Sequence, residues 1–334
     1  MTDNGITHPA HPESPQPASP SPVAPAYDLF RGPNGLRAGW RALLFLLVNV
    51  ALFVVLFTAL ALVAKLRGGS SPRPGSMLTP LGLTFSEGAT LLVALVSAFL
   101  MSRIERRNFG AYGLPLRFAF RRHFWIGALG GFTAISASLL GIFAFHGFHL
   151  TAITTHGDTL VTATAAWSVA FIVVGLSEEF VFRGYLQYTL TTGIGFWPSA
   201  ILMSILFGAA HATNPGETIF GLVSVVFFGL LFCLFLRRTG NLWWAVGFHT
   251  GWDWGQTFFY GVPDSGIAPY HSLFSSVFNG PRWLTGGTVG PEASIFAPAA
   301  LLIVAVLFNR VYRQPAEPAA APAANVAAAA PTTL

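Results

Sequence analysis

The residues best suited to chemistry in this 334-residue chain are ionisable side chains inside long apolar stretches. A charged group at the centre of a membrane-spanning helix costs about 2.5–3.5 kcal/mol, so such groups usually face a protein interior or a water-filled cavity. They fall in three motifs in which two residues are four apart: Glu178 and Glu179 with Arg183, His211 with the apolar Phe207, and His249 with Asp253. This placement predicts a buried site rather than a charged surface.

The first cluster divides into a neutralised pair and a remaining carboxylate. Residues four apart share one face of an α-helix, so Arg183 can neutralise Glu179. Adjacent residues lie about 100° apart around the helix axis, so Glu178 points elsewhere and needs a partner from another segment. We therefore expect Glu179 and Arg183 to be structural and Glu178 to be available for chemistry.

The two histidine motifs supply candidate partners for Glu178. The spacing of His249 and Asp253 brings an imidazole and a carboxylate to one point, as it also does where two ligands on a helix reach one metal ion. At 1.5 Å per residue from the predicted cytoplasmic helix ends, Glu178, His211 and these two residues lie about 11–21 Å deep. We expect all four to lie in one central band of the bilayer, where a carboxylate beside histidines can act as a general base.

The segments that carry these motifs are long and apolar. Hydrophobic residues make up 53% of the chain and charged residues 9%, whereas a soluble domain carries about 25% charged residues. A helix needs about 20 apolar residues to cross the hydrocarbon layer. The sequence thus predicts an all-α, polytopic membrane helix bundle with about eight transmembrane helices, near 42–64, 79–101, 124–145, 166–187, 197–212, 218–236, 242–260 and 295–312.

The basic residues predict the orientation of this bundle, because Lys and Arg favour the cytoplasmic side. With the N-terminus inside, only Lys65, Arg67, Arg73 and Arg282 fall outside, so the first hairpin fits least well. The net charge of +5 then has membrane lipid as its partner, and no pattern indicates a nucleic-acid partner. The Ala- and Arg-rich, Lys-poor composition permits a bacterial source. We expect an integral protein of a bacterial cytoplasmic membrane with both termini in the cytoplasm.

Composition also divides the chain into parts. Residues 1–29 are rich in Pro, Ser and Ala, and residues 315–334 in Ala and Pro, so both are expected to be disordered cytoplasmic tails. The transmembrane domain is expected over residues 30–314. The single cysteine, Cys233, lies in the sixth apolar run and excludes an intramolecular disulfide.

The ordered motifs Glu-Glu-x-x-x-Arg, Phe-x-x-x-His and His-x-x-x-Asn or Asp on successive membrane helices resemble the CAAX protease and bacteriocin-processing family (CPBP or Abi), which includes the type II CAAX prenyl endopeptidases. The similarity covers about residues 160–260. It implies an intramembrane endopeptidase that hydrolyses a peptide bond of a membrane-associated protein or peptide, which enters from the membrane. It also implies these roles: water activation by Glu178 and His211, orientation of the site by Glu179 and Arg183, and oxyanion stabilisation by His249 and residue 253.

Asp at position 253 departs from the donor that an oxyanion hole needs, because an ionised aspartate accepts hydrogen bonds but does not donate them. His249 donates alone, or Asp253 is protonated, or Asp253 orients His249. A fourth interpretation is a divalent metal such as zinc, held by His211, His249 and a carboxylate of Glu178 or Asp253. The motifs lack the His-Glu-x-x-His spacing of ordinary zinc peptidases, which favours a glutamate mechanism without a cofactor.

Two other functions are compatible with buried ionisable residues. An ion-coupled transporter also buries Glu, His and Asp at the membrane midplane, but it predicts inverted repeats and broken helices, and neither is visible. A non-proteolytic membrane scaffold or immunity factor would be favoured by loss of a catalytic position, and here all are filled. Glu87 and the Gly127–Gly131 pair indicate only hydrogen bonding and a spacing common in glycine-rich membrane helices.

Overall fold

The computed structural model describes residues 29–32, 35–67, 79–314 and 316, so nearly all of both predicted tails lies outside the described residues. The chain divides into two compact units, residues 1–37 and 38–334. The described part of the first is a short antiparallel hairpin of β1 (Arg31–Gly32) and β2 (Gly35–Leu36).

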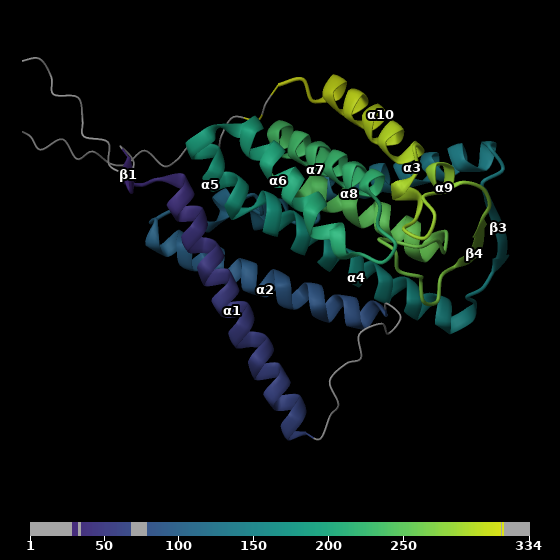
Figure 1. The fold of residues 1–334 in the computed structure, drawn as a ribbon, viewed down its shortest axis with the longest axis horizontal. Coiled ribbons are helices and arrows are strands. Elements are labelled where there is room, and N and C mark those ends of the chain that lie inside the picture. The colour runs from purple at the N-terminus through teal and green to yellow at the C-terminus, as the bar shows by residue number, and fades with distance from the viewer. Residues whose placement is uncertain (1–28, 33–34, 68–78, 315, 317–334) are drawn as a thin grey trace, which may run out of the picture. The chain divides into compact units, whose positions relative to one another are not determined.

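The second unit is a helix bundle, as its apolar sequence predicts (Figure 1). Its main helices are α1 (Ala38–Leu66), α2 (Pro80–Ile104), α3 (Arg122–Ala144), α4 (Gly157–Arg183), α5 (Tyr185–Ile194), α6 (Phe196–Ala210), α7 (Ile219–Thr239), α8 (Trp243–Asp253) and α10 (Phe296–Val311). A π-helical segment, Trp254–Phe259, continues α8, and α9 (Arg282–Thr285) is a single turn.

The predicted number of about eight spanning helices is not confirmed. Among the described residues, six helical stretches are long and apolar enough to cross a membrane, namely Ala38–Leu66, Pro80–Ile104, Arg122–Ala144, Gly157–Ile194, Phe196–Thr213 and Ile219–Thr239. The other two predicted spans are also helical, but α8 with its π-helical continuation and α10 are shorter. Length and apolarity alone do not decide whether these two shorter helices span the membrane, because a helix buried inside a bundle is as apolar as one that faces lipid.

Local signals set several helix boundaries. The hydroxyl of Thr79 accepts a hydrogen bond from the Gly82 N–H at 3.1 Å, and Thr218 accepts one from the Gly221 N–H at 3.0 Å, so threonine caps the start of both α2 and α7. Helix α7 ends at Gly240, whose φ of +71° is a left-handed conformation that glycine adopts without steric cost.

Helix α8 is held at the centre by close contact with α3. Gly127 and Gly131 of α3 face Gly247 and Gly251 of α8, and a Cβ atom at any of the four would lie 2.0–2.4 Å from a backbone oxygen of the other helix. Glycine is therefore required at each position of this seam. The Gly127–Gly131 spacing, which the sequence did not distinguish from a chance pattern, packs the two helices backbone to backbone. Every residue of α8 except His249 is buried.

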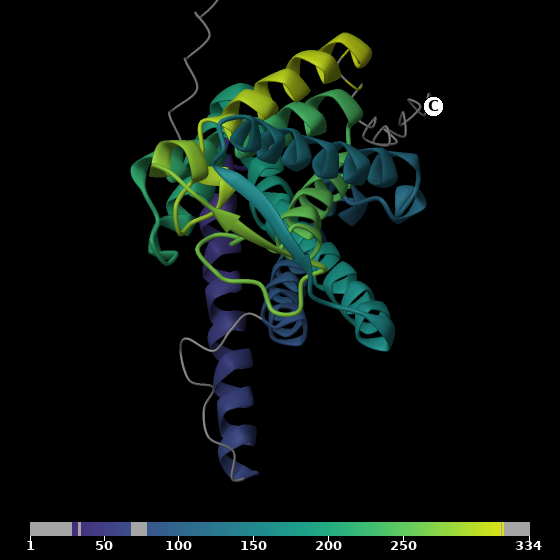
Figure 2. The same cartoon turned by 90° about the vertical axis from the view of Figure 1, so that its right-hand side faces the viewer.

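The interhelical loops gather at two ends of the bundle. The segment between α2 and α3 meets the turn between α7 and α8, where Leu242 donates its N–H to the Gly113 carbonyl at 2.8 Å. At the other end, β3 (Phe148–Ile153) and β4 (Phe274–Phe278) form an antiparallel ribbon that no apolar pattern predicted (Figure 2). Most of the arginines that were assigned to the cytoplasm lie in segments at the first end, while the side of the membrane that this end faces stays a prediction.

Helix α1 is attached mainly through its first turns and extends away from the other helices (Figures 1 and 2). Arg41 forms an ion pair with Glu105 at 2.8 Å, and Arg107 approaches the same carboxylate at 3.3 Å. The Tyr185 hydroxyl donates to the other oxygen of Glu105. This cluster ties α1 to α2 and α5, while most of the apolar surface of α1 is exposed, as expected for a helix that faces lipid.

Candidate active site

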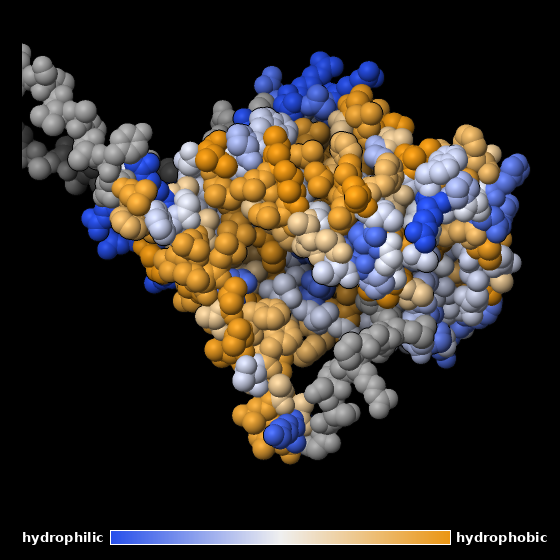
Figure 3. Space-filling view, viewed as in Figure 1, coloured by the Kyte–Doolittle hydropathy of each residue, from blue (hydrophilic) through white to orange (hydrophobic). Residues whose placement is uncertain are grey.

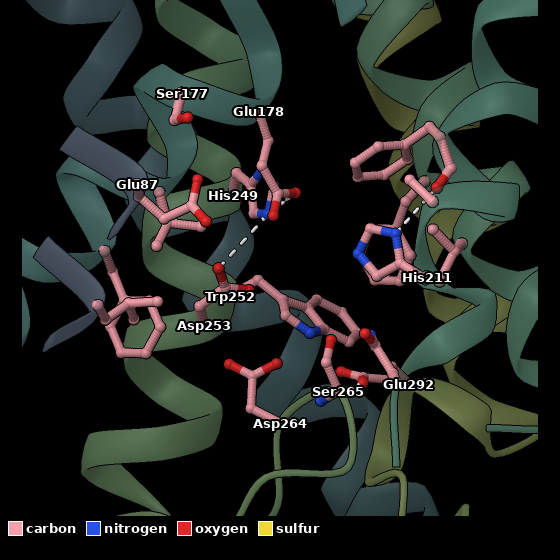
Figure 4. Close-up of a pocket in the computed structure, with 18 of the residues that line it drawn as sticks. Glu87, Ser177, Glu178, His211, His249, Trp252, Asp253, Asp264, Ser265 and Glu292 are labelled. Atoms are coloured by element: carbon pink, nitrogen blue, oxygen red, sulfur yellow. Dashed lines mark hydrogen bonds and ion pairs between the residues drawn. The ribbon is translucent and has the colours of Figure 1, made fainter. Parts of the chain in front are cut away.

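A cavity of about 380 Å³ lies within the bundle. Its walls come from α2, α4, α6, α7 and α8, and its floor comes from the segment 261–294 between the π-helical turn and α10. Apolar side chains cover much of the face shown in Figure 3, and polar groups lie in a hollow between them. Glu178, His211, His249 and Asp253 all line this cavity (Figure 4). The structure thus brings the three sequence motifs together.

Glu179 and Arg183 form the pair that their spacing predicts. Arg183 Nη1 lies 3.3 Å from Glu179 Oε1, and neither side chain is exposed. The guanidinium also lies over the ring of Phe207, with 4.2 Å between its central carbon and the ring centroid, a favourable cation–π contact. Gly229 of α7 leaves space for it, because a Cβ atom there would be 2.8 Å from Arg183 Nη2. Arg183 therefore connects α4, α6 and α7 behind the cavity.

His249 is surrounded by three carboxylates. Its Nδ1 donates to Glu179 Oε1 at 3.2 Å, while its Nε2 lies 3.6 Å from Glu178 Oε2 and 3.4 Å from Asp253 Oδ2. The ring of Phe232 stacks on the imidazole at a centroid distance of 5.3 Å. Glu179, rather than Asp253, thus holds the ring nitrogen that points away from the cavity, and Nε2 points toward the cavity.

Glu178 is the least compensated carboxylate of this group. Its side chain is 25% exposed, and its ion-pair partner among the described residues is His249 at 3.6 Å, beyond hydrogen-bond distance. Glu178 Oε2 is buried with no hydrogen-bond partner among the described residues. A buried acceptor without a partner is costly, so the position suits a group that meets water or substrate in the cavity.

His211 lies across the cavity from Glu178 and His249 (Figure 4). Its Nδ1 is 2.8 Å from the carbonyl oxygen of Phe207, which can only accept, so Nδ1 carries the proton. The neutral ring then has an unprotonated Nε2. His211 begins a 3₁₀ turn directly after α6, and this end of the helix sets its position.

Three further carboxyl groups line the cavity: Glu87 of α2, and Asp264 and Glu292 of segment 261–294. Sequence reasoning treated Glu87 as a buried hydrogen-bonding group and missed the other two, because long-range folding rather than helical spacing places them. Burial raises the pKa of Asp264 to about 6 and also raises that of Glu292. No Lys or Arg is among the described residues that line the cavity, so its lining is strongly acidic.

The donor groups do not fit a metal ion as they are arranged. Within the described ranges, no three His, Cys, Asp or Glu side chains are placed to hold one. His211 is separated from the cluster around His249, and that imidazole already directs Nδ1 to Glu179. We therefore derive no step through a metal.

Comparison with known protein families found a match for the central part of the chain. Residues 160–255 match the family described as type II CAAX prenyl endopeptidase Rce1-like. The resemblance to the CAAX protease family is confirmed over this segment. The match contains all three motifs and ends within the π-helical turn, before segment 261–294. A search of curated proteins found no match.

The central segment of this bundle of apolar helices is thus similar to a family of membrane proteases, and the apolar helices together with this similarity support an integral membrane protein. No feature of the described residues points to nucleic acid. The catalytic type and the role of each residue follow from neither the family nor the fold alone.

Proposed function

We propose that this protein is an intramembrane endopeptidase that uses Glu178 and His211 to activate water against a peptide bond. The observation that carries the proposal is the state of Glu178. Glu178 lines the cavity together with His211 and His249, its side chain is 25% exposed, and its Oε2 has no hydrogen-bond partner among the described residues. A general base needs this combination of a free acceptor and room for water.

The geometry supports the following sequence of steps. A water molecule between Glu178 and His211 donates one proton toward the Glu178 carboxylate and the other toward His211 Nε2, which is unprotonated. Glu178 takes the proton as the water oxygen bonds to the carbonyl carbon. The tetrahedral intermediate then collapses, the C–N bond breaks, and Glu178 returns the proton to the leaving amine.

His249 is the proposed donor to the oxyanion. Because its Nδ1–H is engaged with Glu179, Nε2 can donate only when the ring is an imidazolium. The carboxylates of Glu178 and Asp253 next to Nε2 supply the negative charge with which an imidazolium pairs. Glu179 and Arg183 fix the ring, since the same Glu179 oxygen accepts from both. Asp253 then stabilises the charged ring and does not need to donate.

A membrane-associated protein or peptide is the proposed substrate class, reached from the lipid through the hollow between the apolar surfaces. A non-proteolytic scaffold or immunity factor stays the alternative, and an ion-coupled transporter is less well supported. No observation favours either rival over hydrolysis, because the free carboxylate and both histidines face one cavity.

The test uses membranes from a strain that lacks the gene, incubated with purified parent protein or with Glu178→Gln. Mass spectrometry of new N-termini should show cleavage products with the parent and none with the variant. The two proteins should have the same abundance and the same unfolding temperature in detergent. Asp158→Asn, a matched carboxylate-to-amide change at an exposed position of α4, serves as the control. Equal cleavage by parent and Glu178→Gln would contradict the proposal, and cleavage by neither would favour the scaffold.

A further inference from the structure

Segment 261–294 forms the floor of the cavity although it lies beyond the Rce1-like match. It contributes Asp264, Ser265, Ile267, Ala268 and Glu292 to the lining. No motif of the sequence analysis falls in this segment. The three motifs therefore do not account for the contacts that hold this segment below the site.

A chain of buried hydrogen bonds connects this floor to α8. Trp252 Nε1 donates to Gln256 Oε1 at 2.8 Å, and Gln256 Nε2 donates to Glu292 Oε2 at 2.7 Å and to the Pro263 carbonyl at 2.7 Å. The backbone N–H of Ser265 donates to Glu292 Oε1 at 2.6 Å. Trp252, Gln256 and Glu292 are 2%, 0% and 7% exposed, so water cannot readily replace these bonds. We refer to Trp252, Gln256, Glu292 and the Ser265 amide as the latch.

The chemistry of the latch allows one arrangement. The Trp252 indole only donates, so it fixes the oxygen of the Gln256 amide and turns the amide nitrogen toward Glu292. Each Glu292 oxygen then accepts from a different donor, one on the π-helical turn and one in the floor. Burial raises the pKa of Glu292, and the two donors oppose this effect. Gln256→Glu alone would turn two carboxylates toward each other. Glu292→Gln alone would turn two N–H donors toward each other.

The π-helical turn explains why two neighbouring side chains reach the floor. Residues Trp254–Phe259 follow Asp253 directly, and this wider helix carries both Gln256 and Thr257. Thr257 Oγ1 donates to Asp264 Oδ2 at 2.8 Å, beside the bond from Gln256 to Glu292. Single π-helical turns are frequent at functional sites, where they re-aim side chains.

The latch also reaches the cavity wall on the side of the histidine motif. Trp252 precedes Asp253 in the chain, and Figure 4 places its indole between the His249–Asp253 pair and the floor residues. Loss of the Gln256 amide would remove both the bond that holds this indole and the bonds that hold the floor. Glu178 and His211 are on other helices and have no direct link to the latch.

We propose that Gln256 and Glu292 are positioning residues that hold segment 261–294 and Trp252 in place as the substrate-binding floor of the cavity. The proposal rests on the proposed peptidase function and deepens it, because it assigns substrate affinity to a segment outside the family motifs. Breaking the latch should raise KM and leave kcat nearly unchanged, since the latch touches none of the groups that exchange protons with water.

The test is a reciprocal exchange of the two side chains. Glu292→Gln and Gln256→Glu alone each turn like groups toward each other, and each should raise KM about tenfold with kcat within about twofold. In the double variant, the new amide at position 292 can donate to the new carboxylate at position 256, and its carbonyl can still accept from Ser265. KM should return to within about threefold of the parent, with Pro263 left unpaired.

Two measurements accompany the kinetics. Limited proteolysis of segment 261–294 in proteoliposomes should be faster in each single variant and should return to the parent rate in the exchange variant. This readout does not need peptidase activity, so it separates failure of the latch from failure of the proposed function. Glu217→Gln, the same change outside the cavity lining, should match the parent in both assays.

Additive effects in the exchange variant, for KM and for proteolysis, would overturn the proposal. A loss of kcat equal to the rise in KM would also overturn it, because it would place the pair in the chemistry. If the single variants unfold, recovery of folding and of parent-like KM in the exchange variant supports the proposal, and unfolding of all three contradicts it.

Discussion

Two buried carboxylates in this bundle, Glu105 and Glu178, have very different surroundings. Both oxygens of Glu105 are occupied, by Arg41 and Arg107 on one side and by the Tyr185 hydroxyl on the other, and the side chain is 9% exposed. Glu178 has one ion-pair partner among the described residues, His249 at 3.6 Å, and one of its oxygens is without a hydrogen-bond partner there. The first carboxylate joins helices, and the second faces an acidic cavity.

The difference indicates how burial and function can be distinguished in a membrane bundle. A fully hydrogen-bonded ion cluster offsets the cost of taking charge out of water and leaves nothing for a ligand. An undercompensated carboxylate keeps part of that cost, which hydrogen bonds from a ligand or from water can remove. The comparison predicts that mutations in the first cluster change stability and that those around the second change activity.

The largest combined effect, on stability and on activity, is expected for Arg183→Ala. Glu179 would lose its guanidinium partner inside the protein, at an expected cost of about 3–5 kcal/mol in the free energy of unfolding. Turnover should fall as well, because Glu179 also holds His249. Denaturation in detergent and peptidase assays measure both effects. An inactive protein of parental stability would instead assign Arg183 to substrate contact.

Glu105→Gln should lower stability and leave the chemistry intact. The amide removes the negative charge that neutralises Arg41, so we expect a loss of about 2–3 kcal/mol. Turnover per folded molecule should stay within about twofold of the parent, because Glu105 follows the last turn of α2, whereas α2 lines the cavity near its start, as at Glu87. A variant of parental stability with impaired turnover would contradict the assignment of Glu105 to stability and of Glu178 to activity.

A smaller effect, dependent on pH, is expected for Asp264→Asn. Burial raises the pKa of Asp264 to about 6 in the folded protein from an ordinary value of 3.8. The folded state therefore binds this proton more tightly, so the stabilisation is full below about pH 4 and is lost as the pH rises through 6. At pH 7.5 the variant should be about 1–2 kcal/mol more stable than the parent, with no such gain at pH 4. Parallel stability curves, measured by denaturation across this range, would contradict the assignment.

The last prediction concerns activity alone, and Asp253→Asn should change it far less than Arg183→Ala does. If His249 donates to the oxyanion and Asp253 only stabilises it, an amide can replace the carboxylate and activity should stay within about fivefold of the parent. Assays of both proteins with and without a chelator, together with elemental analysis, provide the measurement. Chelator-sensitive activity with one bound ion per chain, weakened in the variant, would instead support a metal ligand at position 253.

Helical spacing was sufficient to predict the parts of the site that lie on single helices. The Glu179–Arg183 pair and the His249–Asp253 approach depend only on residues four apart, and the structure contains both. Spacing could not predict that Glu179, on another helix, would take the far nitrogen of His249. The orientation of that ring depends on how α4 packs against α8, where Gly175 of α4 lies close to the Val246 carbonyl of α8 and carries no chemical signal.

The residues of the cavity floor could not be predicted from the sequence for a different reason. Asp264 and Glu292 lie in a segment without helical periodicity, and only the long-range bonds from the π-helical turn place them. The enclosure of α8 by other helices was also not predicted, because apolarity does not distinguish protein from lipid as a neighbour. Gly247 and Gly251 repeat the spacing of Gly127 and Gly131, and this repetition was the available signal for that enclosure.

The glycine seam between α3 and α8 has a consequence for engineering the protein. With two backbones in direct contact, no side chain can be enlarged on that face, and the pair moves as one rigid piece that carries His249 and Asp253. Directed evolution of new specificity should therefore accumulate changes in α2, in the end of α6 and in the floor, and libraries built on the facing glycines should yield almost no folded members.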